Sequence, residues 1–368
     1  MSKKIKKDLE NCQIYNKSCY GLEEIENNSI DALITDPPYG ISVFNETWDK
    51  PKETDIPKPE FWGECLQKLK PGAFGLVFSF PRVMHRVMWH LEEKGFIIKD
   101  VLFWVYFNGM PKTRNIGLEI DKELGVESEV VGHYKYSQGY IKNGSDTYKV
   151  HGKKPILQPT SEAGKKYNGA GINIKPFYEP IILVQKRPTE ATLVENMRKY
   201  QVGVLNLEDT RILYPEGEGK VGHNPHPKGR VAGNIITDEA FGHSYDKYFE
   251  VQPSALDQNV EMEYQELYEK MFFEAKVRQN AEDYNIHPTK KPVRLMEHLI
   301  KLLTWEGQTV LDPFMGSGST GVACTAHNRN FIGYELETPF FEIAEKRLQE
   351  AEKRLQEAEK NRQERLDL

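Results

Sequence analysis

Short apolar runs alternate with helix-length amphipathic segments at both ends of this 368-residue chain, and this alternation limits the folds available to it. Strands that alternate with helices form a parallel sheet with helices on its faces. We therefore predict an α/β protein with a Rossmann-like, seven-stranded, mostly parallel sheet. The expected strands are residues 13–16, 30–34, 73–80, 96–107, 179–187, 309–311 and 331–334. The expected helices are one through Leu22 and Ile25, then 61–69, 83–94, a proline-started helix after residue 291, and 319–326.

Two long segments, residues 108–178 and 188–286, lack this periodicity. Between residues 133 and 176 there are eight lysines and two acidic residues, a net charge of 8 − 2 = +6, with five tyrosines interleaved. A basic, aromatic, glycine-rich stretch suits a phosphate backbone and unstacked bases. Loops of this length are uncommon inside one domain, so we interpret both segments as substrate-recognition regions; a solvated loop is the alternative. The candidate contact residues are Lys153, Lys154, Lys165, Lys166, Lys228 and Arg230.

Composition and cysteine spacing exclude several other classes of protein. The content of 39% hydrophobic and 28% charged residues is that of a globular protein. The longest apolar runs have the length of strands, not of membrane helices, and no apolar signal core follows the basic N-terminus. The four cysteines form no CxxC pair or metal-binding cluster. We expect a cytoplasmic protein without a metal or a membrane segment.

The segment LDPFMGSGSTGVACTA, residues 311–326, joins a predicted strand to a predicted helix. Gly316 and Gly318 permit a tight turn, and the helix N-terminus behind them offers backbone amides to a carboxylate or a ribose oxygen. Glu335 follows the next strand, where an acidic side chain can accept hydrogen bonds from both ribose hydroxyls. The GK[ST] signature of triphosphate-binding loops is missing. This pattern predicts a nucleoside-containing cofactor.

The second strand ends abruptly at Asp36-Pro37-Pro38-Tyr39. Two prolines cannot continue a strand ladder, so they fix a rigid loop at its carboxyl end. The Asp36 carboxylate and the Pro37 carbonyl can accept both N–H bonds of an exocyclic amine, which favours a nitrogen with an available lone pair. Tyr39 offers a ring face on which an extruded base can stack.

Five blocks together with their order resemble the beta class of DNA amino-methyltransferases, especially orphan phage- or prophage-type members. They are NSIDALITDPPYG, FWGECLQKLKPGAFGLVFS, KPFYEPIILVQKR, HPTKKPVRLMEHLI and VLDPFMGSGSTGVACTAHNRNFIGYELE. In that class the DPPY motif precedes the glycine loop, with recognition sequence between them. The resemblance implies a circularly permuted methyltransferase fold, S-adenosylmethionine as cofactor, and adenine N6 in DNA as target.

The resemblance also implies roles for individual residues. Catalysis falls to Asp36, Pro37, Pro38 and Tyr39. Cofactor contacts are implied at Asp312, Phe314, Gly316, Gly318, Ser319 and Glu335, with Thr289 and Lys291 near the methionine end. Ser18 stands where family members often carry an acidic residue that meets the adenine of the cofactor.

The expected organisation has six parts. Residues 1–107 form the catalytic half, 108–178 a basic insertion, 179–187 a strand of the catalytic sheet, 188–286 a target-recognition region, and 287–343 the cofactor-binding half. Residues 344–368 contain a tandem heptad, AEKRLQE, with a coiled-coil-like seam at Phe341, Ala344, Leu348, Ala351, Leu355 and Ala358. The tail indicates either a homodimer contact or an extended solvated helix.

Other reactions fit the sequence less well. Methylation of cytosine C5 needs a nucleophilic cysteine, usually after a proline, and none of the four cysteines follows a proline. Methylation of a glutamine or RNA amine usually goes with an Asn-Pro-Pro-Tyr motif in an unpermuted chain. Cytosine N4 methylation uses the same chemistry as adenine N6 methylation and stays open. So does a non-catalytic DNA-binding subunit derived from such an enzyme.

Overall fold

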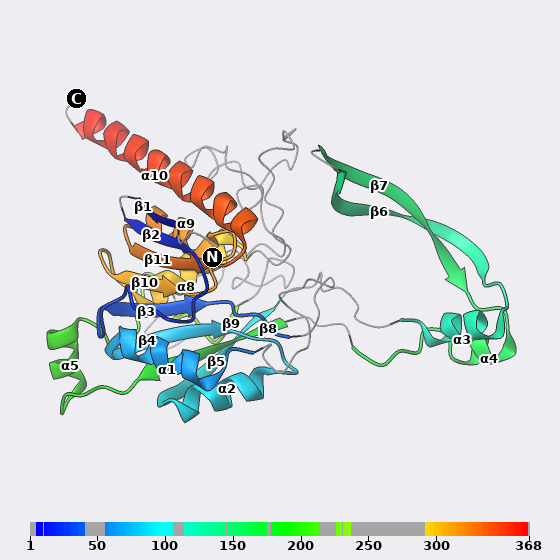
Figure 1. The fold of residues 1–368 in the computed structure, drawn as a ribbon, viewed down its shortest axis with the longest axis horizontal. Coiled ribbons are helices and arrows are strands. Elements are labelled where there is room, and N and C mark those ends of the chain that lie inside the picture. Colours follow the sequence, from blue (N-terminus) through cyan, green and yellow to red (C-terminus); the bar gives the residue numbers. More distant parts are fainter. Residues whose placement is uncertain are drawn as a thin grey trace. The chain divides into compact units, whose positions relative to one another are not determined.

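The computed structural model describes residues 5–9, 11–40, 56–105, 114–143, 146–174, 178–212, 226–229, 231–236 and 291–366. The chain divides into two compact units (Figure 1). Unit 1 comprises Met1–Tyr106, Tyr178–Val277 and His287–Leu368, and unit 2 comprises Phe107–Phe177 and Arg278–Ile286.

Unit 1 is built on a nine-stranded sheet of order β1-β2-β11-β10-β3-β4-β8-β5-β9. The strands are β1 (Ile5–Asp8), β2 (Cys12–Asn16), β3 (Ile30–Thr35), β4 (Leu69–Phe78), β5 (Phe96–Val105), β8 (Tyr178–Lys186), β9 (Ile235–Ile236), β10 (Thr309–Asp312) and β11 (Asn330–Glu335). The strands from β2 to β4 in this order run parallel, whereas β8 is antiparallel to both of its neighbours, β4 and β5. The predicted α/β fold is confirmed: the seven expected strands form the continuous middle of the sheet, and β1 and β9 are short additions at its edges.

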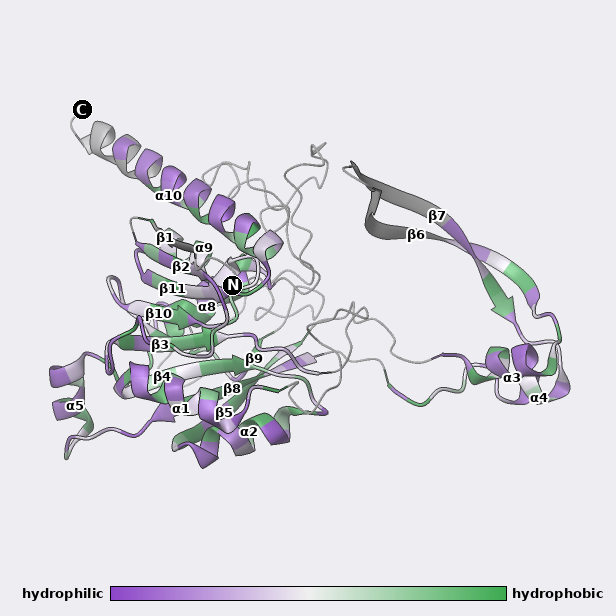
Figure 2. Ribbon diagram, in the orientation of Figure 1, coloured by the Kyte–Doolittle hydropathy of each residue, from purple (hydrophilic) through white to green (hydrophobic). Residues whose placement is uncertain are grey.

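Helices cover both faces of this sheet, because the central strands are apolar on both sides. Ala32 and Ile34 of β3 belong to one core cluster, together with α8 (Val293–Leu303), α9 (Ser319–Ala326) and α10 (Thr338–Leu366). Leu33 belongs to the other, together with α1 (Pro59–Lys68) and α2 (Met84–Glu93). In Figure 2, β3 and α8 carry mainly the colour of hydrophobic residues.

Two expectations for unit 1 were wrong in detail. The helix expected through Leu22 and Ile25 is a series of turns, although both side chains are buried in the core. Their spacing of three places two apolar side chains on one side of a turn as well as on one side of a helix. In the segment expected to be irregular, a helix, α5 (Leu193–Tyr200), and strand β9 are present.

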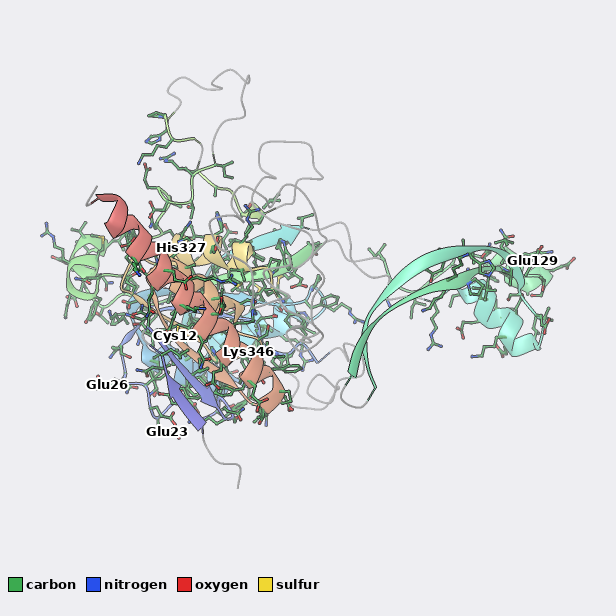
Figure 3. The ribbon with its side chains drawn as sticks, turned by 90° about the horizontal axis from the view of Figure 1, so that it is seen from above. Cys12, Glu23, Glu26, Glu129, His327 and Lys346 are labelled. Atoms are coloured by element: carbon green, nitrogen blue, oxygen red, sulfur yellow. The ribbon has the colours of Figure 1, made fainter. Side chains whose placement is uncertain are left out.

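Unit 2 contains more regular structure than its weak periodicity suggested. A long antiparallel hairpin, β6 (Glu129–Asn143) and β7 (Asp146–Gln158), lies between α3 (Ile116–Leu124) and α4 (Glu162–Lys166) along the chain. Asp121 is 0% exposed and accepts hydrogen bonds from the Thr160 amide at 2.7 Å and the Ser161 hydroxyl at 2.5 Å. Glu129 begins β6 beside these two helices (Figure 3). Asp121 therefore ties α3 to the turn that follows the hairpin.

The first part of the heptad seam is a core element of unit 1. Phe341, Ala344, Leu348 and Ala351 on α10 are buried in the cluster that contains α9. The repeated sequence thus continues an internal packing face outward along α10. The structure describes one chain, so the homodimer stays a prediction.

Candidate active site

The DPPY loop and the glycine turn begin at adjacent strand ends. β3 and β10 are parallel neighbours, with Leu33 opposite Leu311, so the loops that follow them leave the same edge of the sheet. The Thr35 hydroxyl, directly before Asp36, donates a hydrogen bond to Asp312 Oδ1 at 2.8 Å. Ligands of open α/β sheets bind at this edge. The chain therefore brings together two motifs that are 277 positions apart.

Asp312 connects the two loops from inside the protein. Its side chain is 3% exposed and accepts further hydrogen bonds from the Thr320 hydroxyl at 2.6 Å and the Phe314 amide at 3.1 Å. Burial raises the pKa of Asp312 to about 6, although these hydrogen bonds lower it. Its carboxylate thus holds the ends of β3 and β10 and the start of α9 together through hydrogen bonds. A direct contact between Asp312 and the cofactor stays a prediction.

Asp36 is partly buried, and both of its carboxylate oxygens have donors within the chain. The Tyr39 hydroxyl donates to Oδ1, and the Lys291 ammonium donates to Oδ2 at 2.5 Å. The Tyr39 ring stacks on Phe80, with centroids 6.4 Å apart, and Pro37 is buried. The predicted acceptor and the predicted stacking surface therefore lie next to each other.

Lys291 occupies the centre of this group. It is 8% exposed, and its ammonium lies 3.2 Å from Glu179 Oε2 and 5.0 Å from the centroid of the Phe78 ring. Burial lowers the pKa of Lys291, but the charges and hydrogen bonds of Asp36 and Glu179 outweigh burial, so the pKa lies above its ordinary value. Lys291 is therefore a protonated, buried cation shared by two carboxylates.

Glu179 is a site residue that sequence reasoning missed. Because β8 runs antiparallel to β4, its first residues lie at the edge where the parallel strands end. Glu179, the second residue of β8, consequently faces Lys291. The sequence shows an acidic residue at the start of an otherwise apolar strand. It does not show that this strand runs antiparallel, which is what places Glu179 at the active-site edge of the sheet.

The glycine turn has the backbone geometry that its sequence predicted. Gly316 and Gly318 have φ angles of +52° and +80°, and Gly318 caps α9. At this φ angle of Gly318 any side chain is strained, and a Cβ there would also lie 3.0 Å from the Cβ of Ala344, so the position beneath α10 favours glycine. Arg347 of α10 donates to the Ser317 carbonyl at 2.7 Å and to the Ser319 hydroxyl at 3.3 Å. The tail helix therefore holds the turn in place.

Glu335 lies at the end of β11, next to the glycine turn. Burial raises the pKa of Glu335 to about 7, while hydrogen bonds from the backbone of Glu337 and Gly316 lower it. At the end of β2, the side-chain amide of Asn16 donates to the Glu335 carbonyl at 2.9 Å. Ser18 is exposed, and its hydroxyl accepts a hydrogen bond from the Tyr20 amide at 3.2 Å. A cofactor contact by Ser18 stays a prediction.

Phe314, also predicted to contact the cofactor, is half-buried in the loop after β10. Its ring lies 5.3 Å from the ring of Phe61 on α1. It therefore presents an aromatic surface beside the glycine turn.

The predicted DNA-contact residues belong to both units. Lys153, Lys154, Lys165 and Lys166 are exposed on unit 2. Lys228, in unit 1, lies 3.1 Å from Glu208, so its charge is already partly compensated. Thr289 and Arg230 lie outside the described residues.

In the ranges that the structure describes, no three His, Cys, Asp or Glu residues are grouped so as to hold a metal ion. Within the same ranges, no helix has both the length and the apolar surface needed to cross a membrane.

The chain is similar to known proteins in both sequence and structure. A family model described as DNA methylase, of N6 and N4 type, matches residues 30–346. The type II methyltransferase M.HindIII of Haemophilus influenzae is 26% identical over 91% of this chain and 94% of its own length. The type II methyltransferase M.HpaI of Haemophilus parainfluenzae is 44% identical over 89% of this chain and 70% of its own length. The solved structure of the cytosine-N4-specific PvuII DNA methyltransferase aligns with a TM-score of 0.44 at 14% identity, over 94% of this chain and 92% of that one. Since the family model covers both motifs and nearly all of the sequence between and around them, the chain belongs to the N6/N4 family of DNA methylases.

Proposed function

We propose that this member of the N6/N4 DNA methylase family transfers a methyl group from S-adenosylmethionine to the N6 amine of adenine in DNA. The observation that carries the proposal is the hydrogen bond between Thr35 and Asp312. It fixes the loop with the amine acceptor beside the loop suited to the cofactor. Asp at position 36, where the alternative motif residues are Ser or Asn, favours adenine over cytosine.

The residues around the glycine turn fit this cofactor. Gly316 and Gly318, both at positive φ, form a tight turn directly before α9, whose N-terminal backbone amides are donors suited to a carboxylate or a ribose oxygen. Glu335, a largely buried carboxylate with a pKa of about 7, is suited to accept hydrogen bonds from ribose hydroxyls. Lys291 and Thr289 would lie near the methionine end. The cofactor supplies, when bound, a methyl group on a positively charged sulfur.

The chain's own residues prepare the amine for attack. Tyr39 and Phe80 offer a stacking surface to an adenine turned out of the duplex. Asp36 and the Pro37 carbonyl accept the two N–H bonds, so the nitrogen lone pair points away from the ring plane. That lone pair would accept the methyl group that bound S-adenosylmethionine would supply, with the thioether as the leaving group. The surplus proton leaves the nitrogen along the hydrogen bond to Asp36.

Unit 2 supplies DNA contacts in this proposal. Two strands of its hairpin are paired so that Lys135 lies opposite Lys153 and Tyr134 opposite Lys154. A two-stranded ribbon has the dimensions of an element that enters the major groove. Exposed lysines on β7 and α4 would contact phosphates, as predicted for Lys153, Lys154, Lys165 and Lys166.

The direct test is to incubate the protein with methyl-labelled S-adenosylmethionine and DNA, digest the DNA and separate the nucleosides. We expect the label in N6-methyladenine. Label in N4-methylcytosine would overturn the choice of base but not the reaction. DNA binding without any transfer of label would establish a non-catalytic subunit instead.

A further inference from the structure

The catalytic carboxylate is fully occupied before any substrate arrives. Tyr39 donates to Asp36 Oδ1 and Lys291 donates to Oδ2. An incoming amine that needs Asp36 as its acceptor must therefore displace one donor, or share an oxygen with it.

Of the two donors, Lys291 has a second carboxylate, that of Glu179, within reach. Its ammonium already lies 3.2 Å from Oε2 of Glu179, which belongs to β8 and not to the DPPY loop. A buried ammonium cannot lose its counter-ion without a large desolvation penalty. With Glu179 present, Lys291 can release Asp36 and still be paired.

We propose that Glu179 is a positioning residue of the methyl-transfer reaction, which retains Lys291 while Asp36 turns its Oδ2 to the substrate amine. This inference rests on the proposed function, because it assumes that Asp36 accepts a hydrogen bond from an amine. Glu179 acts through Lys291 and does not touch the reacting atoms.

The charges of the cluster support this role. Two carboxylates and one ammonium leave one net negative charge beside the place where the amine becomes positively charged. Without Glu179 the cluster is neutral, and Lys291 competes with the amine for Asp36 alone. Among the residues that the structure describes, the titratable groups that face Lys291 are Asp36 and Tyr39 from the DPPY loop and Glu179 from β8.

The test compares Glu179→Gln with two other variants. Glu179→Asp keeps the charge, and Glu190→Gln removes the partner of Lys199 from a surface ion pair of 2.7 Å, also in unit 1. Single-turnover methyl transfer at pH 8 should fall roughly 10- to 100-fold in Glu179→Gln, as expected for a misplaced reacting group. Glu179→Asp should recover most of the rate, and Glu190→Gln should match the wild type.

A second measurement needs neither DNA nor cofactor. The raised pKa of Lys291 contributes stability that is present below the ordinary lysine pKa and is lost as pH rises through the folded-state value. In Glu179→Gln, Lys291 keeps one carboxylate, so this loss moves to lower pH. The difference in melting temperature between the wild type and Glu179→Gln should therefore be largest below the ordinary lysine pKa of 10.5 and shrink as pH rises above it.

The two measurements separate the inference from the proposed function. A wild type that transfers no methyl group would refute the proposed function, whatever the melting curves show. Wild-type transfer with an unaffected Glu179→Gln rate, or with no melting difference between the two proteins below the ordinary lysine pKa, would overturn the role of Glu179.

Discussion

The tandem heptad of α10 allows a controlled test of how the tail supports the cofactor turn. Arg347 and Arg354 occupy the same position in two identical heptads, yet their surroundings differ. Arg347 is 4% exposed and donates to the Ser317 carbonyl at 2.7 Å and hydroxyl at 3.1 Å, and to the Ser319 hydroxyl at 3.3 Å. Arg354 pairs with Glu350 of the same helix at 3.0 Å.

The expected free energies follow from these contacts. A hydrogen bond to a charged group contributes about 1.5–3 kcal/mol, and the buried stem of the arginine adds packing. Removing the cation also removes the cost of burying its charge. We therefore expect Arg347→Ala to lower the free energy of unfolding by about 2–4 kcal/mol. An i,i+4 pair on a helix contributes about 0.3–0.5 kcal/mol, and the Arg354 side chain, 10% exposed, adds some packing, so Arg354→Ala should cost about 1 kcal/mol, less than Arg347→Ala.

Urea unfolding followed by tryptophan fluorescence measures this difference directly. All five tryptophans belong to unit 1, so the signal reports the unit that contains α10. Calorimetric titration with S-adenosylmethionine should show an affinity about tenfold lower in Arg347→Ala, a loss of about 1.4 kcal/mol. Equal destabilisation by the two variants would refute the idea that Arg347 fastens the turn.

Two further predictions concern pH and salt. Burial raises the pKa values of Asp312 and Glu335 to about 6 and about 7, so ionising these carboxyl groups destabilises the folded protein. Through these two groups, the free energy of unfolding without cofactor should be about 2 to 4 kcal/mol higher at pH 5 than at pH 7.5. A lower free energy of unfolding at pH 5 in both the wild type and Asp312→Asn would contradict this. Replacing Lys153 and Lys154 by alanine should weaken DNA binding and reduce the slope of log affinity against log salt concentration by about 2. Fluorescence anisotropy at several salt concentrations measures this slope. An unchanged slope would mean that these lysines of β7 do not contact DNA.

Much of the catalytic sheet was readable because its signals are local. An apolar run followed by Pro37-Pro38 indicates a strand end, because proline cannot continue a strand ladder. Gly316 and Gly318 occupy positive-φ positions that favour glycine. The order of the two motifs indicated the family of the chain. Because both motifs follow parallel strands, they lie at the same edge of the sheet. These parts of the site depend on residues within a few positions of each other.

The missed parts depend on contacts between distant segments. Glu179 matters only because β8 is antiparallel, and Lys291 reaches Asp36 across 255 positions. The motif gave no sign of the hydrogen bonds that Thr35 and Thr320 donate to Asp312, whose contact with the cofactor stays a prediction. No residue pattern encodes these pairings, since they arise from strand direction and packing.

Asp36→Ala offers the most direct test of the central claim, which is that Asp36 serves the chemistry and not the binding of the cofactor. Glu179 remains to pair with Lys291 in this variant, so the site should stay folded. We expect single-turnover methyl transfer to DNA to fall on the order of 10³-fold or more, as for the loss of a preorganised electrostatic partner. The dissociation constant for S-adenosylmethionine should change by less than about threefold, well under the 1.4 kcal/mol of a tenfold change. Near-normal transfer in Asp36→Ala, or a loss of cofactor binding as large as the loss of rate, would contradict the account.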